Sequence, residues 1–280
     1  MDQSFERQHL RDASKSTHWQ QERRNTESMT ADGGPIYLTL PSNSSFDFFP
    51  DNVISNYRTR LTNPLRFSDM RYEIGLFDIQ YPNTWYNLKG DSGYLMVESD
   101  GRREVVKIQN GYYADARSLV DQINVAHGTA FNATEDLLSL HPITEKVTIW
   151  CPSETRVWFS QTLVEMLGLG KDGFDPGIWE GQYVVDTRRG FYAIYVYCDA
   201  IQPRVVGDTL SPLLQVLPIK GKHGDIIWLS YANVQYHPVK CTDISDIHID
   251  IRTDSGENVA FERGKVVATL ALRRKPLALL

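Results

Sequence analysis

One cluster of carboxylates and an imidazole has the residue types and spacing that could do chemistry. It consists of Asp243, Asp246, His248, Asp250 and Asp254. Oxygen ligands at this spacing could hold a hard cation. Three of these residues, however, alternate with isoleucines, which is typical of the outward face of a strand, where charges discourage edge-to-edge pairing. The alternation favours a solvated strand face over a metal site, and Asp254 then begins an ordinary Asp-Ser-Gly turn.

The motifs of common enzyme classes do not occur. Gly-Lys pairs begin at Gly170, Gly221 and Gly264, but no glycine stands five residues before any of them, so none is a phosphate-binding loop. The chain has no Gly-x-Ser-x-Gly, His-Glu-x-x-His or Cys-x-x-Cys. Its histidines stand singly, whereas metal-dependent cupin enzymes need a His-x-His pair. The sequence predicts a protein that is not an enzyme and has no cofactor, metal or small-molecule substrate.

Tryptophans provide a second kind of candidate site. Trp150, Trp158, Trp179 and Trp228 could stack on sugar rings. Such residues more often anchor a core or a protein interface. Carbohydrate binding therefore stays open as an alternative.

The cysteines and the apolar runs bear on the compartment. Cys151, Cys198 and Cys241 are odd in number and far apart, which predicts free, mostly buried thiols in a reducing compartment. No apolar signal segment follows Met1, and no run is apolar enough to span a bilayer. We expect a protein that is intracellular in its host, neither secreted nor bound to a membrane.

The composition is that of a folded protein with a mild negative charge. Hydrophobic residues make up 41% of the 280 residues and aromatic residues 11%, and the net charge is −6. This charge disfavours general binding to nucleic acid or to anionic membranes. The basic stretch Arg273–Lys275 is either solvated or a contact for an acidic partner or for phosphates.

The elements that would position these residues are mostly strands. Helical spacing is limited to 115–127, which Gly128 can close, and to 161–167, which Ser160 can cap. Alternating or continuous apolar residues predict strands at 36–40, 71–81, 93–99, 104–109, 147–152, 247–251 and 266–272. Because no strand-helix-strand rhythm is present, the pattern predicts a sandwich or jelly roll. The Gly-rich stretch 171–182 is expected to be a loop.

The first 33 residues differ from the rest. They mix charges of both signs and contain few apolar side chains, so we expect them to be disordered alone. They are either an inert tail or an arm that orders on a neighbouring protein, with Phe5 and Trp19 as anchors. Residues 34–280 contain no linker and are expected to form one domain.

The most informative stretch is Gly190–Pro218, GFYAIYVYCDAIQPRVVGDTLSPLLQVLP. Its apolar run at 191–198 predicts a strand buried on both faces. Turns are expected at Gln202-Pro203 and at Gly207-Asp208, and a second strand is expected to start at Leu213.

This stretch resembles the penton (minor capsid) proteins of Polinton/Maverick elements and their viral relatives. The similarity lies in the order F-Y-x-Y-x-Y-C-D, then Q-P-x-V-V-G-D-T-L-x-P-L-L. Residues 247–273 are similar to the closing strands of the same family, with D-x-G followed by F-x-x-G-K-V. The matching positions, to which the resemblance assigns a structural role, are Tyr197, Asp199, Gln202, Pro203, Val205, Val206, Gly207, Asp208, Pro212, Leu213, Leu214, Gly256, Phe261, Gly264 and Lys265.

The resemblance implies an all-β fold, a single jelly roll of two antiparallel sheets with loop insertions and two short helices. It also implies a homopentamer at the vertices of a virion capsid, with the major capsid protein as partner. Residues 51–67, 171–189 and 220–240 are candidates for the contacts between subunits. The alternatives are an attachment protein of the fibre-head kind, binding a receptor or a carbohydrate, and a metal-dependent enzyme on the same fold.

Overall fold

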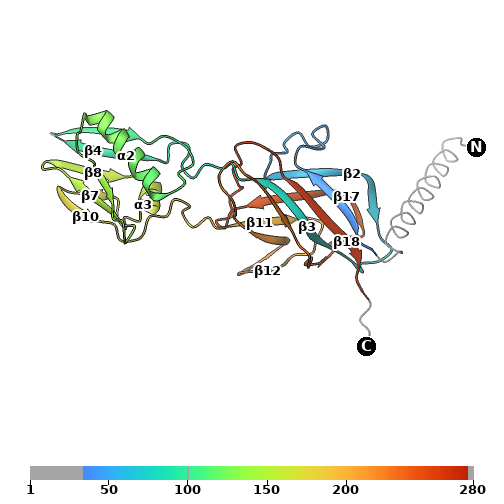
Figure 1. The fold of residues 1–280 in the computed structure, drawn as a ribbon. Helices are drawn as coiled ribbons and strands as arrows, with labels where there is room; N and C mark the ends of the chain where they lie inside the picture. The colour runs from blue at the N-terminus through green and yellow to red at the C-terminus, as the bar shows by residue number, and fades with distance from the viewer. Residues whose placement is uncertain (1–33, 100, 277–280) are drawn as a thin grey trace, which may run out of the picture. The chain divides into compact units, whose positions relative to one another are not determined.

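The computed structural model describes residues 34–99 and 101–276. The chain folds as two compact units. The jelly-roll unit contains the described residues up to Thr84 together with those from Ala193 onward, and the insertion unit is Trp85–Tyr192. The sequence predicted one domain over 34–280, and within the described residues the contacts divide this stretch into these two units (Figure 1). Residues 1–33, with the proposed anchors Phe5 and Trp19, lie outside the described part.

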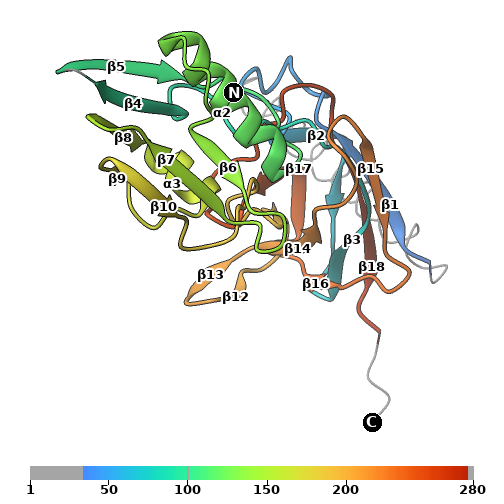
Figure 2. The same cartoon turned by 60° about the vertical axis from the view of Figure 1, so that its left-hand side comes forward.

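Two antiparallel sheets form the jelly-roll unit. In the first, the order is β1 (Ile36–Pro41), β18 (Val267–Arg274), β3 (Tyr72–Pro82) and β15 (Ile226–Ser230), and the short β16 (His237–Pro238) also pairs with β3. In the second, the order is β14 (Leu213–Pro218), β11 (Ala193–Cys198), β17 (Asp243–Arg252) and β2 (Asn56–Arg66). The first sheet can be followed in Figure 2.

The strand order identifies the fold. If the eight main strands are counted along the chain, the first sheet reads first, eighth, third, sixth, and the second reads fifth, fourth, seventh, second. Two four-stranded sheets connected in this way form a jelly roll. The predicted fold class is confirmed for the jelly-roll unit.

Alternating side chains hold the two sheets together. Isoleucines 247, 249 and 251 of β17 are buried, as are Leu270 and Leu272 of β18. Two buried tyrosines also join the sheets. The Tyr57 hydroxyl of β2 donates to the Leu40 carbonyl of β1 at 3.1 Å, and the Tyr81 hydroxyl of β3 donates to the Pro218 carbonyl of β14 at 3.4 Å. The core thus lies between the sheets.

Strand β11 differs from the sequence prediction of a strand buried on both faces. Its burial alternates: Ile194, Val196 and Cys198 are buried, whereas Tyr195 and Tyr197 are only partly covered. Tyrosine combines an apolar ring with a polar tip, so it suits a half-exposed face although it extends the apolar run. The strand therefore has one outward face.

The insertion unit lies between β3 and β11 in the chain and contains two further antiparallel sheets. One has the order β5 (Arg102–Lys107), β4 (Tyr94–Ser99), β8 (Thr155–Phe159) and β9 (Gly173–Phe174). The other has the order β10 (Gly177–Glu180), β7 (Val147–Cys151) and β6 (Leu138–Leu140). The stretch expected to be a loop at 171–182 thus supplies β9 and β10.

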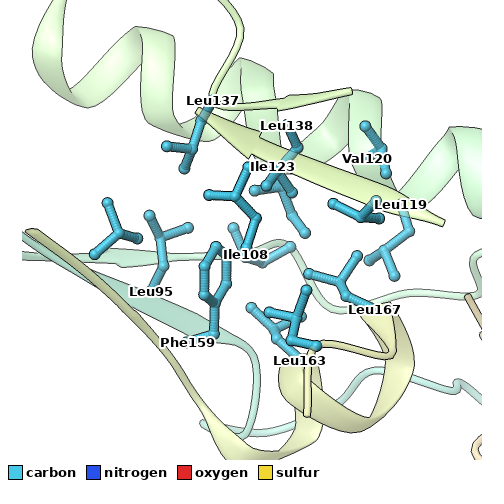
Figure 3. Packing of buried hydrophobic residues seen from close by; sticks show 14 of the residues in the cluster. Leu95, Ile108, Leu119, Val120, Ile123, Leu137, Leu138, Phe159, Leu163 and Leu167 are labelled. Carbon is cyan, nitrogen blue, oxygen red and sulfur yellow. The ribbon is translucent and has the colours of Figure 1, made fainter. Parts of the chain in front are cut away.

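A separate hydrophobic core explains why the insertion unit is compact. Leu95, Ile123, Leu138, Phe159 and Leu163 come from five different elements and converge on this core (Figure 3). They are all buried. Because a contiguous buried cluster is what defines a domain, this segment is more than a loop insertion.

Both predicted helices are present in this unit. Helix α3 (Gln161–Leu167) is capped by Ser160, whose hydroxyl accepts from the Leu163 N–H, and it ends at Gly168 as expected. Helix α2 (Ala116–Phe131) begins after Asp115 but runs past Gly128, the expected end. Asn132 takes the left-handed conformation instead, with φ of 50°, so the stop falls at the asparagine.

Candidate functional site

The acidic cluster on β17 is a network of ion pairs with arginines. Asp246 lies 2.6 Å from an Arg58 guanidinium nitrogen, and Asp199 approaches the same guanidinium at 3.5 Å. Asp243 pairs with Arg66 at 3.3 Å and Asp250 with Arg252 at 2.7 Å. Asp254 lies in a turn before Gly256, which has φ of 87°. Among the described residues no group of His, Cys, Asp or Glu is arranged to hold a metal ion.

The position of β17 changes the interpretation of its charges. The sequence suggested carboxylates that protect an exposed sheet edge, but β17 lies between β11 and β2 and pairs with both. Asp243 and Asp246 therefore meet arginines of the neighbouring strand β2, whereas Asp250 pairs with Arg252 of β17 itself. His248 joins the network through Asn56, whose side-chain oxygen lies 2.8 Å from the His248 Nε2. The cluster stabilises the outer face of the sheet.

Several signature residues have framework roles in the jelly roll. The Asp199 carboxylate accepts from the His248 backbone N–H at 2.8 Å and so extends the contact between β11 and β17. Gln202 donates from its backbone to the Pro238 carbonyl at 2.9 Å and from its side chain to the Val239 carbonyl at 3.2 Å. The Tyr197 ring faces the Arg252 guanidinium at 5.8 Å. These contacts position the segment that follows.

That segment is a hairpin, of which the sequence predicted only the turns. Strands β12 (Arg204–Val206) and β13 (Thr209–Ser211) pair with each other alone and are connected by Gly207 and Asp208. Gly207 has φ of 61°, as the first position of a tight two-residue hairpin turn requires. Exposed Pro203 precedes the hairpin and half-buried Pro212 follows it, and Leu213 and Leu214 return to the core.

The hairpin exposes two aliphatic side chains. Val205 and Leu210 are direct partners across the two strands. Val205 is 75% exposed and Leu210 is 72% exposed. Cross-strand partners lie on the same face of a hairpin, so they form one apolar patch, which we call the hairpin patch. Val206 on the alternate face is only partly exposed.

The second signature stretch fixes the start of β18. Gly264 has φ of 100°, and a side-chain carbon at this position would lie 3.0 Å from the Pro82 ring at the end of β3. The following Val266 N–H donates to the Ser42 hydroxyl at 3.0 Å. Phe261 is half-buried and Lys265 is exposed. Glycine is required here by both the backbone conformation and the close approach.

The tryptophans are not equivalent. Trp158 and Trp179 are partly buried, Trp150 is 38% exposed, and Trp228 is 67% exposed. Trp228 lies on β15, an edge strand that pairs only with β3, next to Ile226, which is 68% exposed. The basic stretch near the end of β18 is not simply solvated, because Arg273 pairs with Glu73 at 2.7 Å and Arg274 with Asp69 at 3.5 Å.

An open cleft of about 690 Å³ lies in the insertion unit, beside α3. It is lined by charged groups, among them Glu165 and Arg189, which pair with each other at 2.7 Å. Lys171 lies 3.8 Å from the centre of the Trp179 ring. No Ser, Cys or His is among the residues that line it. The cleft thus lacks a Ser or Cys nucleophile and the imidazole base that would activate one.

The thiols also do not point to catalysis. Cys151 and Cys198 are buried and Cys241 is exposed, and all three are free. Burial raises the pKa of the Cys198 thiol to about 12 and that of Cys151 to about 11. Neither is a thiolate near neutral pH, and the thiolate is the reactive form.

Comparison with known proteins gives structural likenesses but no match in sequence. No protein-family model matches the chain, and no curated protein matches it. A solved structure, that of the selenomethionine-labelled mavirus penton protein, is similar over 85% of this chain and 98% of that chain, with a TM-score of 0.46 and 10% sequence identity. The assignment of a jelly roll rests on the strand order and register given above. No helix within the described ranges is long and apolar enough to cross a membrane.

Sequence reasoning missed the hairpin patch. Strand β12 is only three residues long and follows Pro203, so the Gln-Pro and Gly-Asp pairs around it indicate turns more strongly than strands. The available signal was two apolar residues, Val205 and Val206, on one side of a Gly-Asp pair and Leu210 on the other.

Proposed function

We propose that this chain is a structural capsid subunit of the penton type, which assembles with copies of itself into closed rings of five at capsid vertices. The observation that carries the proposal is the hairpin patch. The stretch on which the resemblance to penton proteins depends, Gln202–Leu214, is the stretch that folds into a hairpin with Val205 and Leu210 largely exposed. An exposed aliphatic pair on a well-defined hairpin is suited to contact a partner protein.

The physical argument for a ring concerns how identical subunits meet. If the hairpin patch of one subunit binds a different surface of the next subunit, the contact is head-to-tail. Every hairpin patch is then paired only if the subunits close into a ring. Burying a Val or Leu side chain fully stabilises a contact by about 1.5–3 kcal/mol, so the two together make a useful contribution at each interface. The number five comes from the family resemblance.

The remaining parts of the proposal follow from a capsid role. The partners are other copies of this chain and the major capsid protein of the same element, and the location is the virion. Residues 1–33 would contact a neighbouring capsid protein through Phe5 and Trp19. No enzymatic activity, cofactor or nucleic-acid contact is part of the proposal.

The test is the oligomeric state of the full chain. Light scattering after size exclusion should give a mass near five chains, and negative-stain images should show five-fold rings. The double variant V205D/L210D should shift the protein to monomer, because two carboxylates would be buried without partners. The matched control is Ile143→Asp, since Ile143 is 86% exposed but lies in the insertion unit.

Three outcomes would contradict the proposal. Well-formed trimers would favour the attachment-protein alternative. Rings that persist in V205D/L210D would remove the hairpin patch from the interface. A wild-type chain that stays monomeric both alone and with its major capsid protein would leave the ring without support.

A further inference from the structure

A small cavity in the insertion unit has the features of a binding site that the capsid role does not require. It lies beside the C-terminal half of α2 and the end of β7. Its volume is about 150 Å³, and its lining includes His127, Thr134, Glu135, Leu137, Trp150 and Pro152. A cavity of roughly 150 Å³ can hold a molecule the size of benzene. A ligand in it is therefore about the size of one ring.

Trp150 forms the exposed side of the site. Alternation along β7 buries Ile149 and Cys151 and turns Trp150 outward, where it is 38% exposed. Its cross-strand partner on β10 is Ile178, which is 73% exposed. An aromatic side chain beside an exposed aliphatic one gives an apolar surface at the mouth of the cavity. The sheet thus presents an apolar surface to solvent where a soluble protein would normally place polar residues.

His127 gives the site a polar group that has no partner. The residue is 7% exposed and lies on the buried side of α2. Its Nδ1 atom is buried and has no hydrogen-bond partner in the described part of the chain. A buried polar atom left unpaired costs about 1–3 kcal/mol, so native proteins keep few of them. Burial also lowers the pKa of His127, which keeps the ring neutral near pH 7 and leaves one ring nitrogen able to accept a hydrogen bond.

The charge of the lining restricts the ligand. Glu135 is the only charged side chain among the lining residues, and it is exposed at the rim. A carboxylate accepts hydrogen bonds and repels anions. The ligand should therefore carry several donors, no negative charge and one apolar face. A neutral sugar combines these properties, because its hydroxyls donate and the C–H groups on one side of its ring are apolar.

We propose that this cavity binds a single neutral sugar residue, such as the terminal hexose of a glycan. The apolar face of the sugar lies on Trp150. Its hydroxyl groups donate to the exposed Glu135 carboxylate and to the Nδ1 atom of His127, which the imidazole must turn to expose. All the groups involved belong to the insertion unit, so the binding does not depend on ring formation.

The test uses the full chain and a panel of methyl glycosides of glucose, galactose, mannose and N-acetylglucosamine, with N-acetylneuraminic acid as the anionic comparison. Saturation-transfer NMR and calorimetry should detect at least one neutral sugar. Trp150→Ala should lower the affinity for that sugar by roughly tenfold or more, because it removes the stacking surface. The matched control is Trp228→Ala, which removes another exposed tryptophan from the jelly-roll unit and should leave the affinity unchanged.

A second variant keeps the proposal testable if Trp150→Ala does not fold. Glu135 is exposed, so Glu135→Gln should fold normally. It should lower the affinity for the sugar roughly three- to tenfold. Binding of none of the neutral sugars, preference for the anionic one, equal affinity in wild type and Glu135→Gln, or loss of binding in Trp228→Ala would each overturn the proposal.

Discussion

At the scale of single residues, the sequence identified the polar groups of this chain but not their partners. Asp246, His248 and Asp250 were expected on a solvated strand face, but Asp250 is only 8% exposed. The ion pairs of Asp243 and Asp246 depend on β2, about 180 residues away in the chain. A single sequence contains no information on which strand lies beside β17, so these pairs could not be predicted.

His127 provides a prediction at this scale, because burial lowers its pKa below the usual 6.5. The unfolded chain then binds the proton more readily than the folded one. The stability contributed by the neutral ring is present above pH 6.5 and is lost as the pH falls from 6.5 toward the lower folded pKa. Chemical unfolding of the full chain should therefore give a free energy of unfolding that decreases between pH 7 and pH 5.

A variant separates His127 from other titrating groups. Gln at position 127 cannot take up the proton, so His127→Gln should reduce the fall in unfolding free energy between pH 7 and pH 5. Part of the fall should remain, because His237 in the jelly-roll unit also has a pKa lowered by burial and by Arg204. His141→Gln is the matched control, since His141 is an exposed histidine of the same unit. If the unfolding free energy of His127→Gln falls with pH as steeply as that of the wild type, the buried imidazole does not contribute to the pH dependence of stability.

At the scale of elements, prediction was best where apolar residues alternate or run continuously. Strands β3, β7 and β18 and the β4–β5 hairpin were expected close to their observed bounds. Strand β2 was not, because charged and polar residues stand among its apolar ones. Strand β15 was also not predicted, although its sequence IIWLS is a short apolar run. Most of the candidate contact segment 51–67 turned out to be β2, an eleven-residue strand.

Gly264 allows a prediction for the junction of β3 and β18. Gly264→Ala should destabilise the jelly-roll unit by about 1–3 kcal/mol, because it adds strain at φ of 100° and a contact at 3.0 Å with the Pro82 ring. Gly256→Ala is the matched control: its φ of 87° is also left-handed, but its surroundings are open. Urea unfolding should show a smaller loss for Gly256→Ala. Equal losses would mean that the contact with Pro82 contributes nothing.

At the scale of the whole molecule, the sequence predicted the jelly roll but not the division of the chain into two compact units. The boundaries at Thr84 and Tyr192 have no marked shift in composition, since strands with similar patterns lie on both sides of each. The evidence for a second domain is the separate core, which depends on contacts between residues 88 and 174 that no local pattern reveals. The hairpin patch and the cavity beside Trp150 belong to different units.

Excision of the insertion unit tests this division. The ends to be joined lie near each other: the Tyr81 hydroxyl reaches the Pro218 carbonyl at 3.4 Å, and Pro218 is the cross-strand partner of Ala193. A Gly-Ser linker of about eight residues spans up to roughly 26 Å, so it should connect Thr84 to Ala193 without strain. We expect a protein with a β-type circular dichroism spectrum and a single cooperative unfolding transition.

The excised protein also separates the two functional proposals. It keeps Val205 and Leu210, so it should form rings of the same subunit number as the full chain, and V205D/L210D should abolish them in both. It lacks Trp150 and His127, so it should bind no sugar. Rings lost from a folded excised protein would place part of the subunit interface on the insertion unit, and retained sugar binding would show that the cavity beside Trp150 is not the site. A chain that cannot fold after excision would instead mean that the jelly roll depends on the inserted domain for its stability, contrary to the separate cores described here.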